Sequence, residues 1–193
     1  MEGTDSHRII LVGGGARSGK SAFAVSLARR LGARRAFVAT AQALDPEMRE
    51  RIDHHVRERG GDFQTIEEPV HLPARIEELR NIDVVVVDCL TLWLSNLLLQ
   101  NTSPSRILER VEELSAAMAR RRFHAIVVTN EVGMGLVPET ALGRDFRDIC
   151  GRAHQRIAQC ADEIYLTVLG SVLRLPPGPV TAVTAQSSGG YPT

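Results

Sequence analysis

Short runs of apolar residues alternate along this chain with longer segments in which apolar residues recur every three or four positions. The runs at residues 8–12 (RIILV) and 84–87 (VVVV) are almost uninterrupted. Such runs are typical of strands that are covered on both faces of a parallel sheet. The longer segments have the period of amphipathic helices. We therefore predict an α/β fold with an open, mostly parallel sheet and helices on both faces.

The same pattern places the individual elements. In the helix predicted at residues 18–31, the expected inward positions are Ala22, Val25, Ala28 and Leu31. Ligands of open α/β sheets bind at the carboxyl ends of the strands, so candidate residues are sought there. Strands are expected at 8–12, 35–39, 84–87, 125–129, 163–168 and 172–175, and helices at 18–31, 45–59, 71–80, 90–99, 105–121 and about 139–160.

The length of 193 residues fits one domain, which we place at residues 1–175, followed by a Pro/Gly/Ser-rich tail at 176–193. Basic and acidic residues number 23 each, and this balance argues against a nucleic-acid binder. The first residues are polar and unlike a signal peptide, and no apolar run is long enough for a membrane span. The three cysteines lie far apart, with no zinc-ligand spacing, as expected for reduced thiols of a cytoplasmic protein.

Residues 14–21 read GGARSGKS and match the phosphate-binding pattern G-x-x-x-x-G-K-[ST] between a predicted strand and a predicted helix. Lys20 is the only lysine in the chain, and we expect it to neutralise the β- and γ-phosphates of a nucleotide. The alternative is a glycine-rich turn that only joins strand to helix. The full motif instead predicts a P-loop NTPase of the RecA-like kind. The predicted phosphate-binding residues are Gly14, Gly15, Ala16, Arg17, Ser18, Gly19, Lys20 and Ser21.

Asp88 ends the valine strand, in the position of a Walker B carboxylate. We expect Asp88 and the Ser21 hydroxyl to hold Mg²⁺. The alternative for Asp88 is a cap of the following helix. These motifs leave the reaction open among kinase, GTPase, ATPase motor and nucleotidyltransferase.

Residues 45–59 contain a histidine pair on a predicted helix. Met48, Ile52, His55 and Val56 follow the i, i+4, i+7, i+8 pattern of an inward face, whereas His54 falls on the polar face. An inward imidazole among phosphates can act as nucleophile, base or phosphate ligand. Spacing alone favours two ordinary histidines, a half-buried His55 and a solvated His54. A metal site of the pair is disfavoured because adjacent helical residues diverge.

The chain resembles the bifunctional adenosylcobinamide kinase / adenosylcobinamide-phosphate guanylyltransferase family from about residue 9 to residue 172. The segments that carry this resemblance are GGARSGKS at 14–21, ATAQ at 39–42 with DPEM after it, RIDHH at 51–55, DCLTLWLSNLL at 88–98, TNEVGMGLVPE at 129–139 and FRDICGRAHQ at 146–155.

The resemblance implies two reactions. The first phosphorylates the aminopropanol hydroxyl of adenosylcobinamide with GTP or ATP, and the second transfers GMP from GTP to that phosphate through guanylylated His55. It also implies a homotrimer. Besides the P-loop, it places nucleotide contacts on Ala39, Thr40, Ala41, Val56, Arg57, Glu58, Arg59, Glu67 and Asp88.

The rival interpretation is a GTPase-type switch or binding module, for which Gln42 or Glu131 would position water. Asn130 and Glu131 follow a predicted strand at its carboxyl end. They could belong to a switch or substrate loop, or to a plain connection from strand to helix. The arginines at 144, 147 and 152 receive no role.

Overall fold

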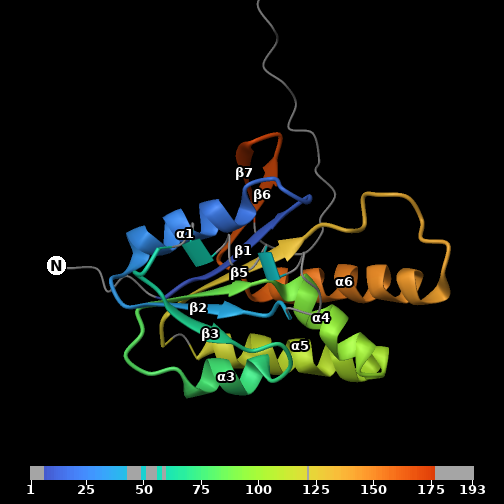
Figure 1. The fold of residues 1–193 in the computed structure, drawn as a ribbon, viewed down its shortest axis with the longest axis horizontal. Coiled ribbons are helices and arrows are strands. Elements are labelled where there is room, and N and C mark those ends of the chain that lie inside the picture. The colour runs from blue at the N-terminus through green and yellow to red at the C-terminus, as the bar shows by residue number, and fades with distance from the viewer. Residues whose placement is uncertain (1–6, 43–48, 51–55, 58–59, 121, 177–193) are drawn as a thin grey trace, which may run out of the picture.

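A computed structural model describes residues 7–42, 49–50, 56–57, 60–120 and 122–176. Seven strands form one sheet in the order β3-β2-β4-β5-β1-β6-β7 (Figure 1). All neighbouring strands are parallel except β6 and β7, which form an antiparallel pair at one edge. The strands are β1 (Ile9–Gly14), β2 (Arg35–Ala39), β3 (Gln64–Glu67), β4 (Val84–Asp88), β5 (His124–Asn130), β6 (Glu163–Val168) and β7 (Ser171–Leu175).

Helices cover both faces of this sheet. One face carries α1, which contacts β1, β4 and β5, and the other is covered by α3, α4, α5 and α6 (Figure 1). The predicted open, mostly parallel α/β fold is thereby confirmed. The helices are α1 (Lys20–Leu31), α3 (Leu72–Glu78), α4 (Leu90–Leu99), α5 (Pro104–Ala119) and α6 (Ala141–Cys160).

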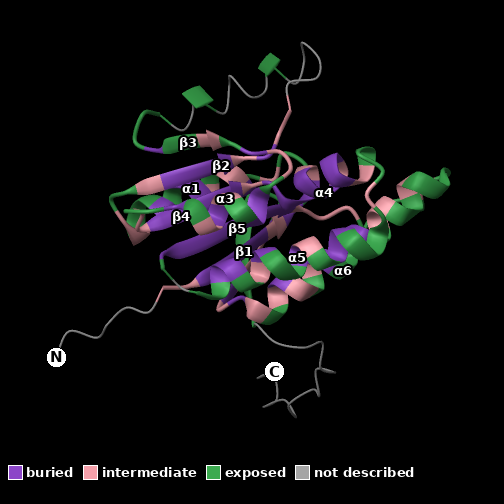
Figure 2. Cartoon of the chain, turned by 90° about the horizontal axis from the view of Figure 1, so that it is seen from below, coloured by how far each residue is buried: buried purple, intermediate pink, exposed green. Residues whose placement is uncertain are grey.

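The strand sequences explain the two-sided core. In β4, Val85 and Val87 join the core beneath α3, α4, α5 and α6, whereas Val84 and Val86 join the core beneath α1. Successive side chains of a strand point to opposite faces, so a strand with helices on both sides needs apolar residues at every position. The central strands are accordingly buried along most of their length (Figure 2).

Two details differ from the sequence prediction. The helix expected at residues 18–31 begins at Lys20, and its buried apolar residues are Ala24, Val25 and Ala28, while Ala22 is exposed. Strand β3 was not predicted, because its four residues (QTIE) are polar apart from Ile66 and lie at a sheet edge. The P-loop shifts the first helix, and an edge strand needs little apolar sequence.

The helix predicted at residues 45–59 lies largely outside the described residues. Within it, residues 49–50 and 56–57 are helical. His54, His55, Glu58 and Arg59 are among the residues that the structure does not describe. The proposed domain limit at residue 175 coincides with the end of β7, and residues 177–193 are not described.

Candidate functional site

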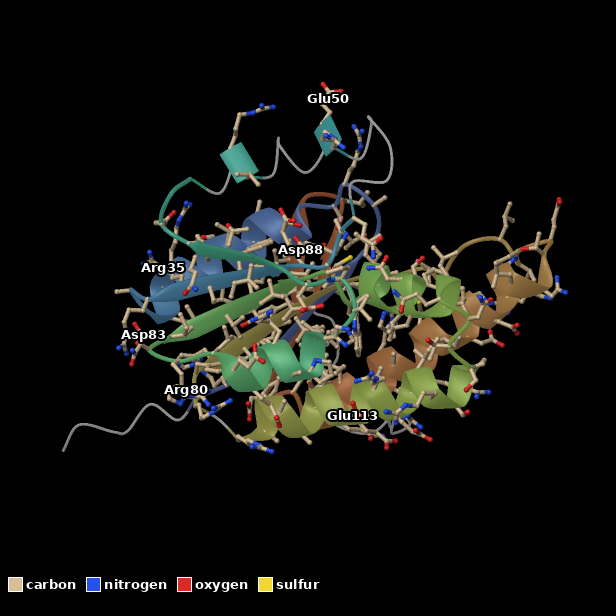
Figure 3. The ribbon with its side chains drawn as sticks, turned by 60° about the horizontal axis from the view of Figure 1, so that its bottom comes forward. Arg35, Glu50, Arg80, Asp83, Asp88 and Glu113 are labelled. Carbon is tan, nitrogen blue, oxygen red and sulfur yellow. The ribbon has the colours of Figure 1, made fainter. Side chains whose placement is uncertain are left out.

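The candidate site lies at the carboxyl edge of the sheet. Two aspartates mark the opposite ends of β4: Asp83 precedes the strand and Asp88 is its last residue (Figure 3). Asp83, at the amino end, pairs with Arg34 and accepts the backbone N–H of Ala33 and Arg34, and these bonds lower its pKa to about 2. Asp88, at the carboxyl end, is instead close enough to Lys20 of the P-loop for its charge to act on the pKa of that ammonium. Asp83 therefore ties the start of β4 to the segment before β2, through Ala33 and Arg34. Asp88 is the aspartate at the carboxyl edge, where the candidate site lies.

The P-loop begins at Gly14, the last residue of β1, and ends at Ser21 in the first turn of α1. Gly19 precedes the helix with φ of 92°, and Arg17 also has a positive φ of 54°. Glycine adopts such left-handed conformations without strain. The positive end of the α1 dipole lies at the carboxyl end of β1, where we expect a phosphate to bind.

Lys20 is buried, with 6% of its surface exposed. Its Nζ donates hydrogen bonds to the carbonyl oxygen of Gly15, at 2.5 Å, and to Ser18 Oγ, at 3.5 Å. Burial lowers the pKa of this ammonium, and the nearby charge of Asp88 opposes that shift. The P-loop thus holds its positive charge inside the loop, beside a carboxylate.

The conformation of the P-loop depends on Thr167 of β6. Its Oγ1 is 2.6 Å from Ser18 Oγ and 3.3 Å from the carbonyl oxygen of Gly13, to which it donates. A Cβ atom on Gly14, which has φ of 153°, would lie 2.3 Å from Thr167 Oγ1. The residue at position 14 must therefore be glycine for β1 and β6 to pair here. Sequence patterns gave no sign of Thr167, because its role depends on the order of the strands.

We expect Gly14→Ala to destabilise the fold and Gly15→Ala to leave its stability unchanged. The added methyl group of Gly14→Ala overlaps Thr167, whereas a Cβ on Gly15 meets no atom within 4 Å. Overpacking of this kind costs roughly 1–3 kcal/mol. Thermal unfolding of the two variants measures the difference, and equal melting temperatures would contradict the close packing of Gly14 against β6.

Asp88 is not the N-cap of α4, because that position is occupied by Cys89. Cys89 itself is buried, and burial, followed by the charge of Asp88, raises its pKa to about 12. The thiol therefore stays protonated at neutral pH and is not a nucleophile. Cys150 and Cys160 are also free cysteines.

The predicted contact residues of β2 and β3 lie at the same edge as Asp88. Ala39 is in register with Asp88 on one side and with Glu67 on the other. Thr40 is fully buried, and its hydroxyl donates to the carbonyl oxygen of Cys89 at 2.7 Å and accepts the Cys89 N–H at 2.8 Å. Thr40 thus joins β2 to the start of α4. The side chain of Glu67 is exposed, and Ala41 is half-buried.

The nucleotide contacts predicted after the histidine pair are described only in part. Val56 and Arg57 are exposed, and Glu58 and Arg59 lie outside the described residues. His55, the predicted nucleophile, also lies outside them. The assignments of these five residues stay predictions.

A buried polar network that the sequence did not reveal supports the tip of β5. Thr91 Oγ1 lies 2.9 Å from Thr129 Oγ1, which lies 2.7 Å from His154 Nε2. His154 Nδ1 is 3.7 Å from Glu131 Oε2, and burial lowers the pKa of the imidazole although Glu131 opposes this. The network ties α4, β5 and α6 together behind Asn130. Its members come from three distant segments, so spacing along the chain carried no signal of it.

Comparison with known protein families assigns the chain to one family. A family model described as "Cobinamide kinase / cobinamide phosphate guanyltransferase" matches residues 10–175, from the second residue of β1 to the end of β7. The chain belongs to this family. The cobinamide kinase / cobinamide phosphate guanyltransferase family is the one that the P-loop, the histidine pair and the segment at 129–139 had indicated.

Individual relatives agree with this assignment. The chain is 39% identical to "Bifunctional adenosylcobalamin biosynthesis protein CobU" of Escherichia coli (strain K12), over 84% of this chain and 96% of that protein. It is 41% identical to the protein of the same name in Salmonella typhimurium, again over 84% of this chain and 96% of that protein. It is 42% identical to "Bifunctional adenosylcobalamin biosynthesis protein CobP" of Pseudomonas aeruginosa, over 83% of this chain and 92% of that protein.

Among solved structures, the RadB recombinase aligns with a TM-score of 0.48 and 15% identity, over 83% of this chain and 74% of that chain. At this level of similarity it adds nothing to the family assignment. None of the described helices is long and apolar enough to cross a membrane.

Proposed function

We propose that this chain phosphorylates the aminopropanol hydroxyl of adenosylcobinamide with GTP or ATP and then transfers GMP from GTP to the product through His55. The observation that carries the proposal is a P-loop whose buried Lys20 is within electrostatic reach of Asp88 at the carboxyl edge, in a chain of this family. A bare switch module would share the P-loop. The family membership favours group transfer over that alternative.

In the kinase step, the hydroxyl oxygen of adenosylcobinamide forms a bond to the γ-phosphorus. The bond between that phosphorus and the β–γ bridging oxygen breaks, the nucleoside diphosphate leaves, and the hydroxyl proton passes to solvent. Lys20 and the P-loop N–H groups stabilise the charge on the phosphate oxygens, which is the main source of catalysis in phosphoryl transfer. Lys20 leaves its internal acceptors, Gly15 and Ser18, to make this contact.

In the guanylyl step, an unprotonated ring nitrogen of His55 attacks the α-phosphorus of GTP. A P–N bond forms, the bond to the α–β bridging oxygen breaks, and pyrophosphate leaves. A phosphate oxygen of adenosylcobinamide phosphate then attacks the same phosphorus and releases the histidine. The product is adenosylcobinamide-GDP.

The residues present fit Mg²⁺. The Ser21 hydroxyl and the Asp88 carboxylate offer two oxygen ligands, and Mg²⁺ usually takes one or two protein oxygens together with substrate phosphates and water. The part of the chain that the structure describes holds no cluster of three or more metal-ligating side chains, so a cage made only of protein is not expected there. Held by Ser21 and Asp88, Mg²⁺ would supply positive charge that neutralises the negative charge developing on the phosphate oxygens.

We expect Asp88→Asn to raise the Mg²⁺ concentration needed for half-maximal activity by roughly 10-fold or more, while the fold stays intact. The amide keeps the size of the carboxylate but loses its negative charge. A magnesium titration of both reactions measures the effect. The matched control is Asp83→Asn at the other end of β4, and an unchanged titration for Asp88→Asn would refute the metal role.

Two isotopic labels test the proposed function. With adenosylcobinamide, γ-labelled nucleotide should transfer its label to the corrinoid. With GTP labelled on the α-phosphorus, the label should first attach to protein and then move to adenosylcobinamide phosphate. Hydrolysis without either transfer would instead identify a GTPase-type module. The homotrimer implied by the family stays a prediction.

A further inference from the structure

Asn130 occupies a strand tip at the site to which the proposed function gives no task. It ends β5, which lies between β1, the strand leading to Lys20, and β4, the strand ending at Asp88. Asn130 is in register with Gly14 of the P-loop, and the next backbone N–H, of Glu131, donates to the Gly14 carbonyl oxygen at 2.9 Å. The residue therefore adjoins the place where phosphates bind.

The side chain of Asn130 points to the α1 side of the sheet. Ile126 and Val128, which alternate with it along β5, belong to the core beneath α1, and so does Cys89. The Asn130 amide nitrogen lies 3.9 Å from Cys89 Sγ. Lys20 is close enough to Cys89 to influence its pKa. Asn130, Cys89, Asp88 and Lys20 thus form one group at the edge of the sheet.

The backbone of Asn130 is held firmly while its amide group remains available. The hydroxyl of Thr91 accepts the Asn130 N–H at 2.8 Å, and Thr91 is fixed in turn by Thr129 and His154. Within the described residues, the one hydrogen bond of the amide group is the long contact to sulfur, which is a weak acceptor. A rigid backbone with an amide donor free to take a better acceptor is the arrangement expected of a preorganised ligand.

We propose that the Asn130 amide is a catalytic group of the kinase step, where its N–H donates a hydrogen bond to an oxygen of the transferred γ-phosphoryl group. This inference rests on the proposed kinase function. As the bond from the acceptor oxygen to the γ-phosphorus forms and the bond to the bridging oxygen breaks, charge builds on the phosphoryl oxygens and on the diphosphate that leaves. The amide stabilises the phosphoryl oxygens from the tip of β5, beside the P-loop, and neither gains nor loses a proton.

The test compares Asn130→Ala and Asn130→Asp with Gln159→Ala as a control. Asn130→Asp keeps the side-chain volume but replaces the donor with a negative charge. Gln159→Ala removes an exposed amide near the end of α6, away from the carboxyl edge. We expect kcat of the kinase step to fall roughly 100-fold in Asn130→Ala and further in Asn130→Asp, because one such donor contributes about 10²–10³ in rate. The control should match the wild type.

Two further readouts separate catalysis from a structural role. The variants should lose affinity for a non-hydrolysable GTP analogue while their affinity for GDP is unchanged, because only the triphosphate has the γ-oxygens. Transfer of GMP to preformed adenosylcobinamide phosphate should fall less than the kinase rate, since bonds change at the α-phosphorus there. An equal loss of analogue and GDP binding, or kinase kcat within threefold of wild type, would overturn the proposal.

The proposed function can fail separately from this inference. A wild-type protein that transfers no γ-phosphoryl group to adenosylcobinamide would refute the kinase function. The comparison of GTP analogue with GDP would still show whether Asn130 contacts the γ-phosphate.

Discussion

Lys20→Ala is expected to abolish both the kinase and the guanylyl transfer activities. Each reaction needs the β- and γ-phosphates held and neutralised, in one case around the phosphorus under attack and in the other on the departing pyrophosphate. No other lysine exists in the chain, and Lys20 is buried next to Asp88, so no neighbouring ammonium can replace it. We expect each rate to fall roughly 10³-fold or more.

The two rates are measured separately, the second with preformed adenosylcobinamide phosphate. Arg30→Ala is the matched control, because it removes an exposed cation from the last turn of the same helix. It should leave both rates near those of the wild type. If either activity survives Lys20→Ala at a comparable rate, the two reactions do not share this P-loop.

His55→Ala is expected to remove the guanylylated intermediate, whereas His54→Ala should leave it largely in place. Two independent arguments select His55: the helical pattern that it forms with Met48, Ile52 and Val56, and its match to the second histidine of the family motif. The experiment maps label from GTP labelled on the α-phosphorus by mass spectrometry. We expect labelling of His55→Ala to drop to background.

The chemistry of the bond gives two further checks. A phosphoramidate should be labile in acid and stable in alkali, unlike a serine ester. Its formation needs a neutral ring, so labelling should decrease as the pH falls below the pKa of an ordinary histidine, about 6.5. The kinase rate of His55→Ala should persist, because that step does not use the nucleophile. Label found on His54, or retained by His55→Ala, would contradict the assignment.

The strands and the phosphate motif were predictable because their signals are local. Four consecutive valines in β4 can be satisfied only by burial on both faces, and the glycines, Lys20 and Ser21 form one continuous segment. The comparisons confirm the family that these motifs indicated. Strand β3 was not predicted, because it lies at the sheet edge and only one of its residues, Ile66, is partly buried. Its sequence therefore lacks the run of apolar residues that marks a buried strand.

The sequence by itself determined the class of fold, the phosphate-binding loop and the family, since each depends on short-range order along the chain. The tertiary structure decided which strand tips meet. Strand order placed Thr167 against Gly14 and put Asn130 between Lys20 and Asp88, although these residues are far apart in sequence. Strand order also brought the hydroxyl of Thr40 within hydrogen-bonding distance of the Cys89 backbone. Hydrogen bonds between distant segments depend on how the chain packs in three dimensions. Periodicity and motif spacing along the sequence therefore cannot predict them.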